Sequence, residues 1–152
     1  MVLPEDGANR QIANGFVLEV NPDSMRRMQV LPEAGGWKEV LDKFEGEHVA
    51  EMGRFRERLM VLVLDLDGQM GRLATARNRI PADLRDRVFI IGTLTDPEQL
   101  RQLLGRSFEA IGAALASDCR DDQSNTWGHD LLVHNADEVQ RLSEAVRALL
   151  FA

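Results

Sequence analysis

The chain contains no tyrosine and only one cysteine, Cys119. The first absence excludes enzymes that use a tyrosine of their own as a covalent nucleophile. The second excludes an internal disulfide, so we expect a protein of the reducing cytoplasm. No apolar run approaches the roughly 20 residues that span a bilayer. The acidic start, MVLPEDGANR, also lacks the basic and apolar regions of a signal peptide. We therefore expect a cytoplasmic protein with no membrane partner.

Basic side chains are scarce as well. The chain has 18 Lys and Arg residues against 25 Asp and Glu residues, which gives a net charge of −7. Domains that coat nucleic acid through electrostatics alone are usually basic, so this balance argues against that class. An enzyme that touches nucleic acid locally, through a metal ion and a few arginines, remains compatible with it.

Strand-like and helix-like apolar patterns alternate along the chain. Short apolar runs typical of buried strands occupy residues 1–4, 28–32, 59–68 and 87–92. Helical spacing occupies residues 7–20, 35–52, 71–80, 95–105 and 107–119, and again from about residue 135. The alternation predicts a three-layer α/β fold, with a mainly parallel four-stranded sheet and helices on both faces. We expect one domain over residues 1–152, with a core at about 1–105 and a helical C-terminal extension at about 106–152.

One alternative affects the early part of the chain. Residues 15–20 and 25–32 could instead pair as a β-hairpin around the turn signal NPDS at residues 21–24.

Two helix starts carry the spacing of a capping box. Thr95 is followed three residues later by Glu98, and this helix is expected to stop at Gly105. Asn135 is followed in the same way by Glu138, which predicts a second capping box at the start of the last helix.

The most informative stretch is VLVLDLDG, residues 61–68. Its apolar residues predict a buried strand, and Asp65 and Asp67 follow at the C-terminal end of that strand. Residues two apart in an extended chain point to the same side, so both carboxylates can face one point. Adjacent negative charges raise each other's pKa unless a cation lies between them. The pattern therefore favours a divalent metal site at the edge of the sheet.

A third carboxylate has two candidates. Glu19 would serve if FVLEV, residues 16–20, were a strand, and Glu5 would serve if MVLP were one. Glu5 has the better context, because a short strand, an acidic residue, a glycine and a helix follow one another there.

These motifs resemble the Toprim domain of topoisomerases, bacterial primases, small ribonucleases and the overcoming-lysogenization-defect (OLD) nucleases of phage defence. The resemblance rests on Glu5 after the first strand and on the Asp-x-Asp of residues 65–67. The segment VLPEAGGW is also similar to the one that follows the family's second strand. VFIIGTLTDPEQL is similar to the strand and Glu-bearing helix of OLD-type members. The chain departs from the family at Asp6, which separates Glu5 from Gly7.

The resemblance implies a Mg²⁺- or Mn²⁺-dependent phosphodiesterase or nuclease, and a phage-defence or mobile-element system as its setting. It implies that Glu5, Asp65 and Asp67 bind the metal and act in catalysis, and that Glu98 is a further metal ligand. Arg72, just past the acidic strand end, is the candidate contact to a nucleic-acid phosphate. Since the chain has no tyrosine, topoisomerase activity by this chain alone is excluded.

Two other functions stay open. DLDG also resembles the start of the haloacid dehalogenase-like phosphatase signature, in which the first Asp is a nucleophile; Thr93, Asp121 and Asp122 could stand for its later motifs. That family needs a downstream lysine, whereas Lys38 and Lys43 both precede Asp65. The third possibility is a non-catalytic Toprim-like subunit whose acidic surface binds a protein partner.

Overall fold

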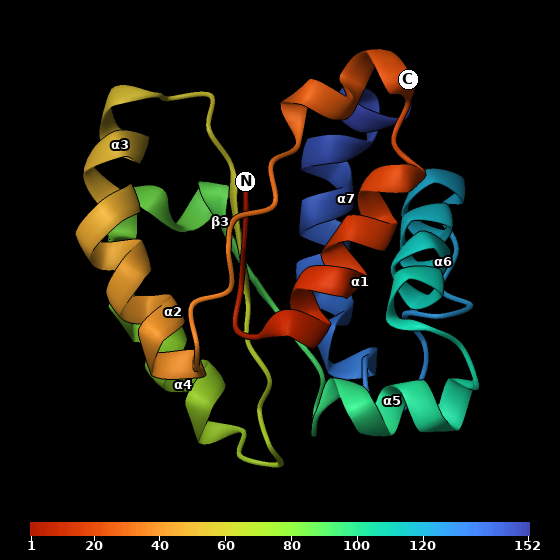
Figure 1. Cartoon of the computed structure of the whole chain (residues 1–152). Helices are drawn as coiled ribbons and strands as arrows, with labels where there is room; N and C mark the ends of the chain where they lie inside the picture. The colour runs from red at the N-terminus through yellow and green to blue at the C-terminus, as the bar shows by residue number, and fades with distance from the viewer.

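Three short parallel strands form the centre of the protein. In the computed structural model, which describes residues 1–152, these are β1 (Val2–Pro4), β2 (Met60–Val63) and β3 (Val88–Ile91), in the order β1-β2-β3. Leu62 of β2 pairs with Leu3 on one side and with Ile90 on the other. The expected α/β fold with a parallel sheet is confirmed (Figure 1).

The expected fourth strand, at residues 28–32, is reduced to a single bridge between Val30 and Val2. The Val2 N–H donates to the Gln29 carbonyl, and the Leu31 N–H donates to the Val2 carbonyl. The next donor on the β1 side would be Pro4, which has no N–H, and the Pro4 carbonyl instead accepts from the Ala34 N–H, so no regular strand pairing follows. The sheet therefore has three strands and one bridged segment beside β1.

Seven α-helices surround the sheet: α1 (Gly7–Leu18), α2 (Trp37–Lys43), α3 (Val49–Arg54), α4 (Gly71–Arg79), α5 (Pro97–Leu104), α6 (Phe108–Asp121) and α7 (Ala136–Leu150). Because α1 runs through residues 15–18, the alternative hairpin does not form. The single helix expected at residues 35–52 is divided, since a π-helical turn, η2 (Phe44–His48), lies between α2 and α3. Short 3₁₀ segments complete the chain: η1 (Pro22–Arg27), η3 (Ala82–Arg87) and η4 (Val133–Asn135). No helix is long and apolar enough to cross a membrane.

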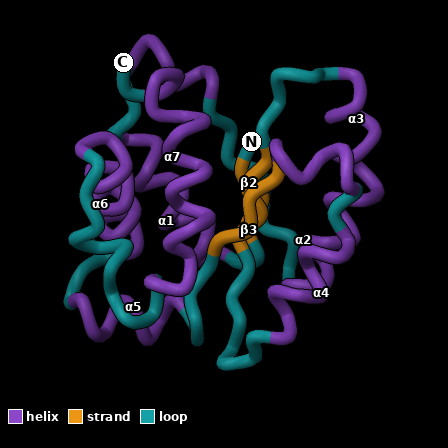
Figure 2. The backbone as a smooth tube through the Cα atoms, turned by 180° about the vertical axis from the view of Figure 1, so that it is seen from behind, coloured by secondary structure: helices purple, strands orange, loops and turns teal.

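The sheet separates two groups of helices. Figures 1 and 2 show α2, α3 and α4 on one face and α1, α6 and α7 on the other. Alternate strand residues supply the two interfaces, as the pleat requires. Met60 and Leu62 belong to the cluster beneath α2–α4, whereas Val61 and Ile91 belong to the cluster beneath α1 and α6.

Helices α1 and α6 cross in close contact at two glycines. A Cβ atom on Gly15 would collide with the backbone of Glu109, and one on Gly112 would collide with the Ile12 carbonyl. Glycine is therefore required at both positions for the two backbones to approach. Because of this contact, α6, which the sequence places in a C-terminal extension, packs directly on the first helix of the core.

Side chains from the start of α7 occupy the open edge of β3. The Asn135 side chain accepts from the Gly92 N–H and donates to the Gly92 carbonyl, and the Glu138 carboxylate accepts from the Ile90 N–H at 2.8 Å. These groups bond to the strand as a further strand would, which protects the edge. Asn135 makes no side-chain cap bond, so the capping box predicted there is wrong.

The capping box predicted at Thr95 and Glu98 is also wrong. The N-cap of α5 is Asp96, whose carboxylate accepts from the Gln99 N–H at 2.9 Å, and Pro97 occupies the first helical position. The predicted stop at Gly105 is confirmed, because this residue has the left-handed φ of 62°.

Candidate metal and phosphate site

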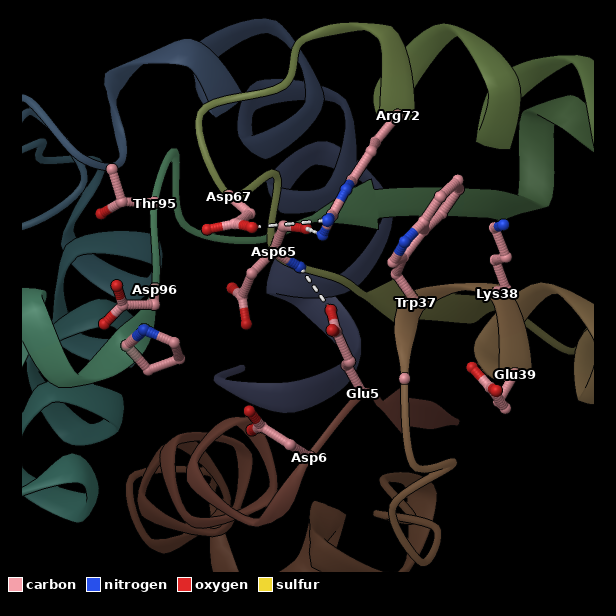
Figure 3. Close-up of a pocket in the computed structure, with 12 residues that line it drawn as sticks. Glu5, Asp6, Trp37, Lys38, Glu39, Asp65, Asp67, Arg72, Thr95 and Asp96 are labelled. Carbon is pink, nitrogen blue, oxygen red and sulfur yellow. Dashed lines mark hydrogen bonds and ion pairs between the residues drawn. The ribbon is translucent and has the colours of Figure 1, made fainter.

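An acidic pocket of about 490 Å³ lies where β1 and β2 end and α5 begins. This is the edge at which parallel α/β sheets commonly bind ligands. Its lining includes six carboxylates and two cations: Glu5, Asp6, Glu39, Asp65, Asp67 and Asp96, with Lys38 and Arg72 (Figure 3). The three carboxylates singled out in the sequence thus line one pocket, although Glu5 is 60 residues from Asp65 in the chain.

Glu5 is bound directly to the second strand end. Its Oε2 atom accepts a hydrogen bond from the Asp65 backbone N–H at 2.7 Å (Figure 3). Asp6, the residue that interrupts the family pattern, is the N-cap of α1 and accepts from the Asn9 N–H at 2.9 Å. The short first strand and the capped helix together hold Glu5 at the pocket wall.

Asp65 is buried, with 5% of its surface exposed. Oδ1 accepts from the backbone N–H and the hydroxyl of Thr93, at 3.0 and 2.8 Å, and Oδ2 accepts from the Asn9 side chain at 2.8 Å. A buried carboxylate with three donors is strongly stabilised in place. Asp65 therefore joins β2, β3 and α1 beneath the pocket.

Asp67 differs from Asp65 in both exposure and backbone. Its side chain is 69% exposed, and its φ is 49°, in the left-handed region that Asp tolerates better than most residues. The Asp67 N–H donates to the Thr95 carbonyl, which holds this turn against the loop after β3. Asp67 is thus a carboxylate presented to solvent at the mouth of the pocket.

Arg72 is the cation nearest to these carboxylates. Its guanidinium donates to the Asp65 carbonyl at 3.2 Å, lies 3.5 Å from Asp67 Oδ2 and stacks 5.1 Å from the centroid of the Trp37 ring. Its Nε is buried and has no hydrogen-bond partner. The arrangement holds the guanidinium rigidly and leaves an unused donor.

Burial in the pocket raises the pKa of two carboxyl groups, those of Glu5 and Asp65. Burial, with the neighbouring charges of Asp65 and Asp6, raises the pKa of Glu5 from 4.5 to about 7, against the opposing effects of the Asp65 N–H bond and of Arg72. Burial also raises the pKa of Asp65, although its bonds from Thr93 and Asn9 oppose the shift. Glu5 therefore changes its protonation state near neutral pH, as a general acid or base must.

The other acidic candidates lie elsewhere. Glu98 is exposed in the first turn of α5 and does not line the pocket, whereas Asp96, two residues earlier, does. Glu19 and Asp121 both bind Arg120 at the far end of α1, a helix of 12 residues and thus about 18 Å long. Asp122 pairs with Arg147 at the end of α6. Glu19, Asp121 and Asp122 therefore lie away from Asp65, paired with arginines.

Sequence reasoning missed several residues of this site. Asp96 carried a detectable signal, since Asp-Pro-Glu before an apolar helix is typical of an N-cap. The sequence gives no signal that Asn9 belongs to the site, because a polar residue in the first turn of a helix usually faces solvent. The position of Lys38 before Asp65 in the sequence argues against the phosphatase signature and does not indicate a place in the site. The structure shows that Lys38 lines the pocket from α2.

The donor chemistry suits a hard divalent cation, because carboxylate oxygens are the protein ligands that Mg²⁺ and Mn²⁺ prefer. No three Asp, Glu, His or Cys side chains stand close enough to hold a metal ion by themselves. Mg²⁺ generally keeps several waters and uses one or two carboxylates with substrate phosphates, so a complete protein cage is not required. Glu5 and Asp67 keep more free acceptor capacity for a cation than Asp65, which accepts three hydrogen bonds from Asn9 and Thr93.

Comparison with protein-family models, with curated proteins and with solved structures gives no match to this chain.

Proposed function

We propose that the acidic pocket binds Mg²⁺ or Mn²⁺ and hydrolyses a phosphodiester of nucleic acid, as the resemblance to Toprim nucleases implies. The observation that carries the proposal is the hydrogen bond between Glu5 and the Asp65 N–H, which brings two distant carboxylate motifs to one pocket. Carboxylates at the C-terminal ends of neighbouring parallel strands are a suitable arrangement for this chemistry.

Each side chain has a distinct role in this proposal. When bound, the cation supplies polarisation of the phosphoryl group and neutralises its developing charge. Glu5 and Asp67 hold it, and Asp65 positions Glu5 through its backbone N–H. The pKa of about 7 belongs to Glu5 without a cation; a bound cation would lower this pKa and keep Glu5 ionised as a ligand.

Substrate binding falls to the two cations of the pocket. Arg72, whose guanidinium is held by the Asp65 carbonyl and stacked on Trp37, binds a phosphate oxygen, and Lys38 lines the same pocket. A local contact of this kind needs no basic surface, which agrees with the net charge of −7.

The phosphatase alternative receives less support. Both carboxylate oxygens of Asp65, the would-be nucleophile, accept hydrogen bonds from Asn9 or Thr93, and the residue is buried. Asp121 and Asp122, which would supply the later motif, form ion pairs with Arg120 and Arg147 away from the pocket. Three hydrogen bonds and burial leave Asp65 little free acceptor capacity to direct at a substrate as a nucleophile.

The test compares Mn²⁺ binding and cleavage in wild type and Asp67→Asn. Asn tolerates the left-handed backbone, so this variant removes charge with little change in fold. We expect Mn²⁺ affinity, measured by calorimetry, to fall at least about tenfold. We also expect cleavage of end-labelled DNA and RNA to be lost, and the harsher Asp67→Ala to do the same.

The matched control is Asp83→Asn, an exposed aspartate in η3 outside the pocket. It should bind and cleave as wild type does. Cleavage that survives both Asp67 substitutions would refute the proposed site. Hydrolysis of phosphomonoesters in place of nucleic acid would favour the phosphatase, and an absence of Mn²⁺ binding would favour the partner-binding subunit.

A further inference from the structure

A second cavity, of about 550 Å³, lies on the opposite side of the sheet from α2–α4. It runs between the face of β2 and the helices α1 and α7, and 18 of its 26 lining residues are hydrophobic. Val61 and Val63 of the central strand line it, as do Ala13 and Phe16 of α1. Its volume and apolar lining are those of a site for a small organic ligand.

The central strand shows that this space is unfilled. Met60 and Leu62, which face α2–α4, are fully buried, whereas Val61 and Val63, which face the cavity, are only partly buried. Apolar side chains in the middle of a sheet are normally packed to crystal-like density. The cavity therefore leaves apolar surface uncovered at the place where a core is usually tightest.

The cavity is positively charged at one end. Arg58 lies just before β2, and Arg26 and Arg27 lie in η1, at the end of the molecule where the strands begin (Figure 1). Glu57 is the one acidic side chain in the lining. Three arginines around an apolar space are notable in a chain whose net charge is −7.

The other end of the cavity approaches Asn9 and Thr93. Both are buried, and both direct polar groups at Asp65. Because Asn9 and Thr93 already donate hydrogen bonds to Asp65, the end of the cavity that they line does not require a polar group on the ligand. Val63 is four residues from Leu59, so the lined face of β2 is about 13 Å long.

We propose that this cavity binds a linear aliphatic carboxylate, with its chain along Val61 and Val63 and its head group at Arg26, Arg27 and Arg58. The hydrocarbon chain of the ligand covers the exposed apolar surface of the cavity. The arginines form ion pairs and hydrogen bonds with its carboxylate. This site is separate from the acidic pocket and does not depend on the function proposed there.

The test titrates the full chain with decanoate and with decanol, its uncharged counterpart. We expect saturable one-to-one binding of decanoate by calorimetry, with chemical-shift changes at the Val61 and Val63 methyl groups. The double variant Arg26→Gln, Arg27→Gln should weaken decanoate at least about tenfold, because the ion pairing is lost, and should leave decanol unchanged. Arg106→Gln, an exposed arginine outside the lining, is the matched control and should behave as wild type.

Filling the cavity provides an independent test. Val61→Phe should abolish the binding of both decanoate and decanol, because the larger side chain occupies the space. The methyl shifts are measured on wild type, so a folding failure of this variant does not affect them. An absence of saturable decanoate binding, shift changes confined to other surfaces, or equal weakening of decanol by the arginine substitutions would each overturn the proposal.

Discussion

Glu5 Oε2 lies 2.7 Å from the backbone nitrogen of Asp65 and accepts its hydrogen bond. This bond joins the end of β1 to the end of β2 and places a carboxylate beside a second, buried one. The hydrogen bond from the Asp65 N–H stabilises the ionised form of the Glu5 side chain. Burial and the nearby charges of Asp65 and Asp6 destabilise the ionised form by more, and so raise its pKa. Its ionisation is therefore linked to folding.

Glu5→Gln should change how stability depends on pH. The pKa of Glu5 in the folded protein, about 7, is above its ordinary value of 4.5, so the native state holds a proton that the unfolded state releases. The contribution of Glu5 to stability is therefore present below about pH 4.5 and is lost as the pH rises to about 7. We expect the loss to be about 1–2 kcal/mol, after allowance for the partly exposed side chain.

Urea unfolding at several pH values measures this effect. Gln can still accept the Asp65 N–H bond, so Glu5→Gln should match wild type near about pH 4 and exceed its stability near about pH 8. Glu144→Gln, an exposed position on α7, should follow the wild-type profile. Identical profiles for Glu5→Gln and wild type would contradict the raised pKa.

The two aspartates of the Asp-x-Asp should differ in their effect on stability. Asp65→Ala leaves the Asn9 side chain and two donors of Thr93 unpaired in the interior, which should cost about 2–4 kcal/mol. Asp67→Asn alters an exposed side chain with one weak ion pair and should change stability by less than about 1 kcal/mol. Equilibrium unfolding in urea measures both, and equal losses would show that Asp65 is not the buried anchor.

Gly15→Ala should destabilise the crossing of α1 and α6. The new methyl group would collide with the Glu109 backbone, which cannot move without displacing α6, so we expect a loss of about 1–3 kcal/mol. Gly53→Ala on α3 is the matched control, because a Cβ there meets nothing within 4 Å. That substitution should stabilise the protein by about 0.5–1 kcal/mol through helix propensity. Thermal unfolding separates the two, and a stable Gly15→Ala protein would contradict the close approach.

Asn135→Ala should expose the edge of β3. It leaves the Gly92 N–H and carbonyl without their partner, with an expected cost of about 1–3 kcal/mol. Hydrogen exchange of the Gly92 amide should accelerate by more than exchange in β1. Gln140→Ala, on the exposed side of α7, should leave that amide unchanged. Unaltered protection of Gly92 in Asn135→Ala would show that the bond does not protect the edge.

Local sequence determined the elements whose signals are local. The apolar runs at β2 and β3, the helical spacing of α1 and α6, and the αL stop at Gly105 all predict their structures, because burial and backbone preference act over a few residues. The two predicted capping boxes are wrong for different reasons, a tertiary contact at Asn135 and a local competitor at Thr95. Asn135 bonds to β3 instead of its own helix, and Asp96 is a better-placed cap than Thr95.

Tertiary structure decided how these elements meet. The sequence placed Asp65, Asp67 and Glu5 after strands, and parallel pairing then requires their ends to share one edge. Only the fold distinguishes a buried Asp65 held by Asn9 and Thr93 from an exposed Asp67, since those partners come from α1 and from beyond β3. The apolar cavity likewise has no sequence signal, because each of its lining residues resembles an ordinary core residue. Its existence depends on how far α1 and α7 stand from the sheet, and long-range packing sets that spacing.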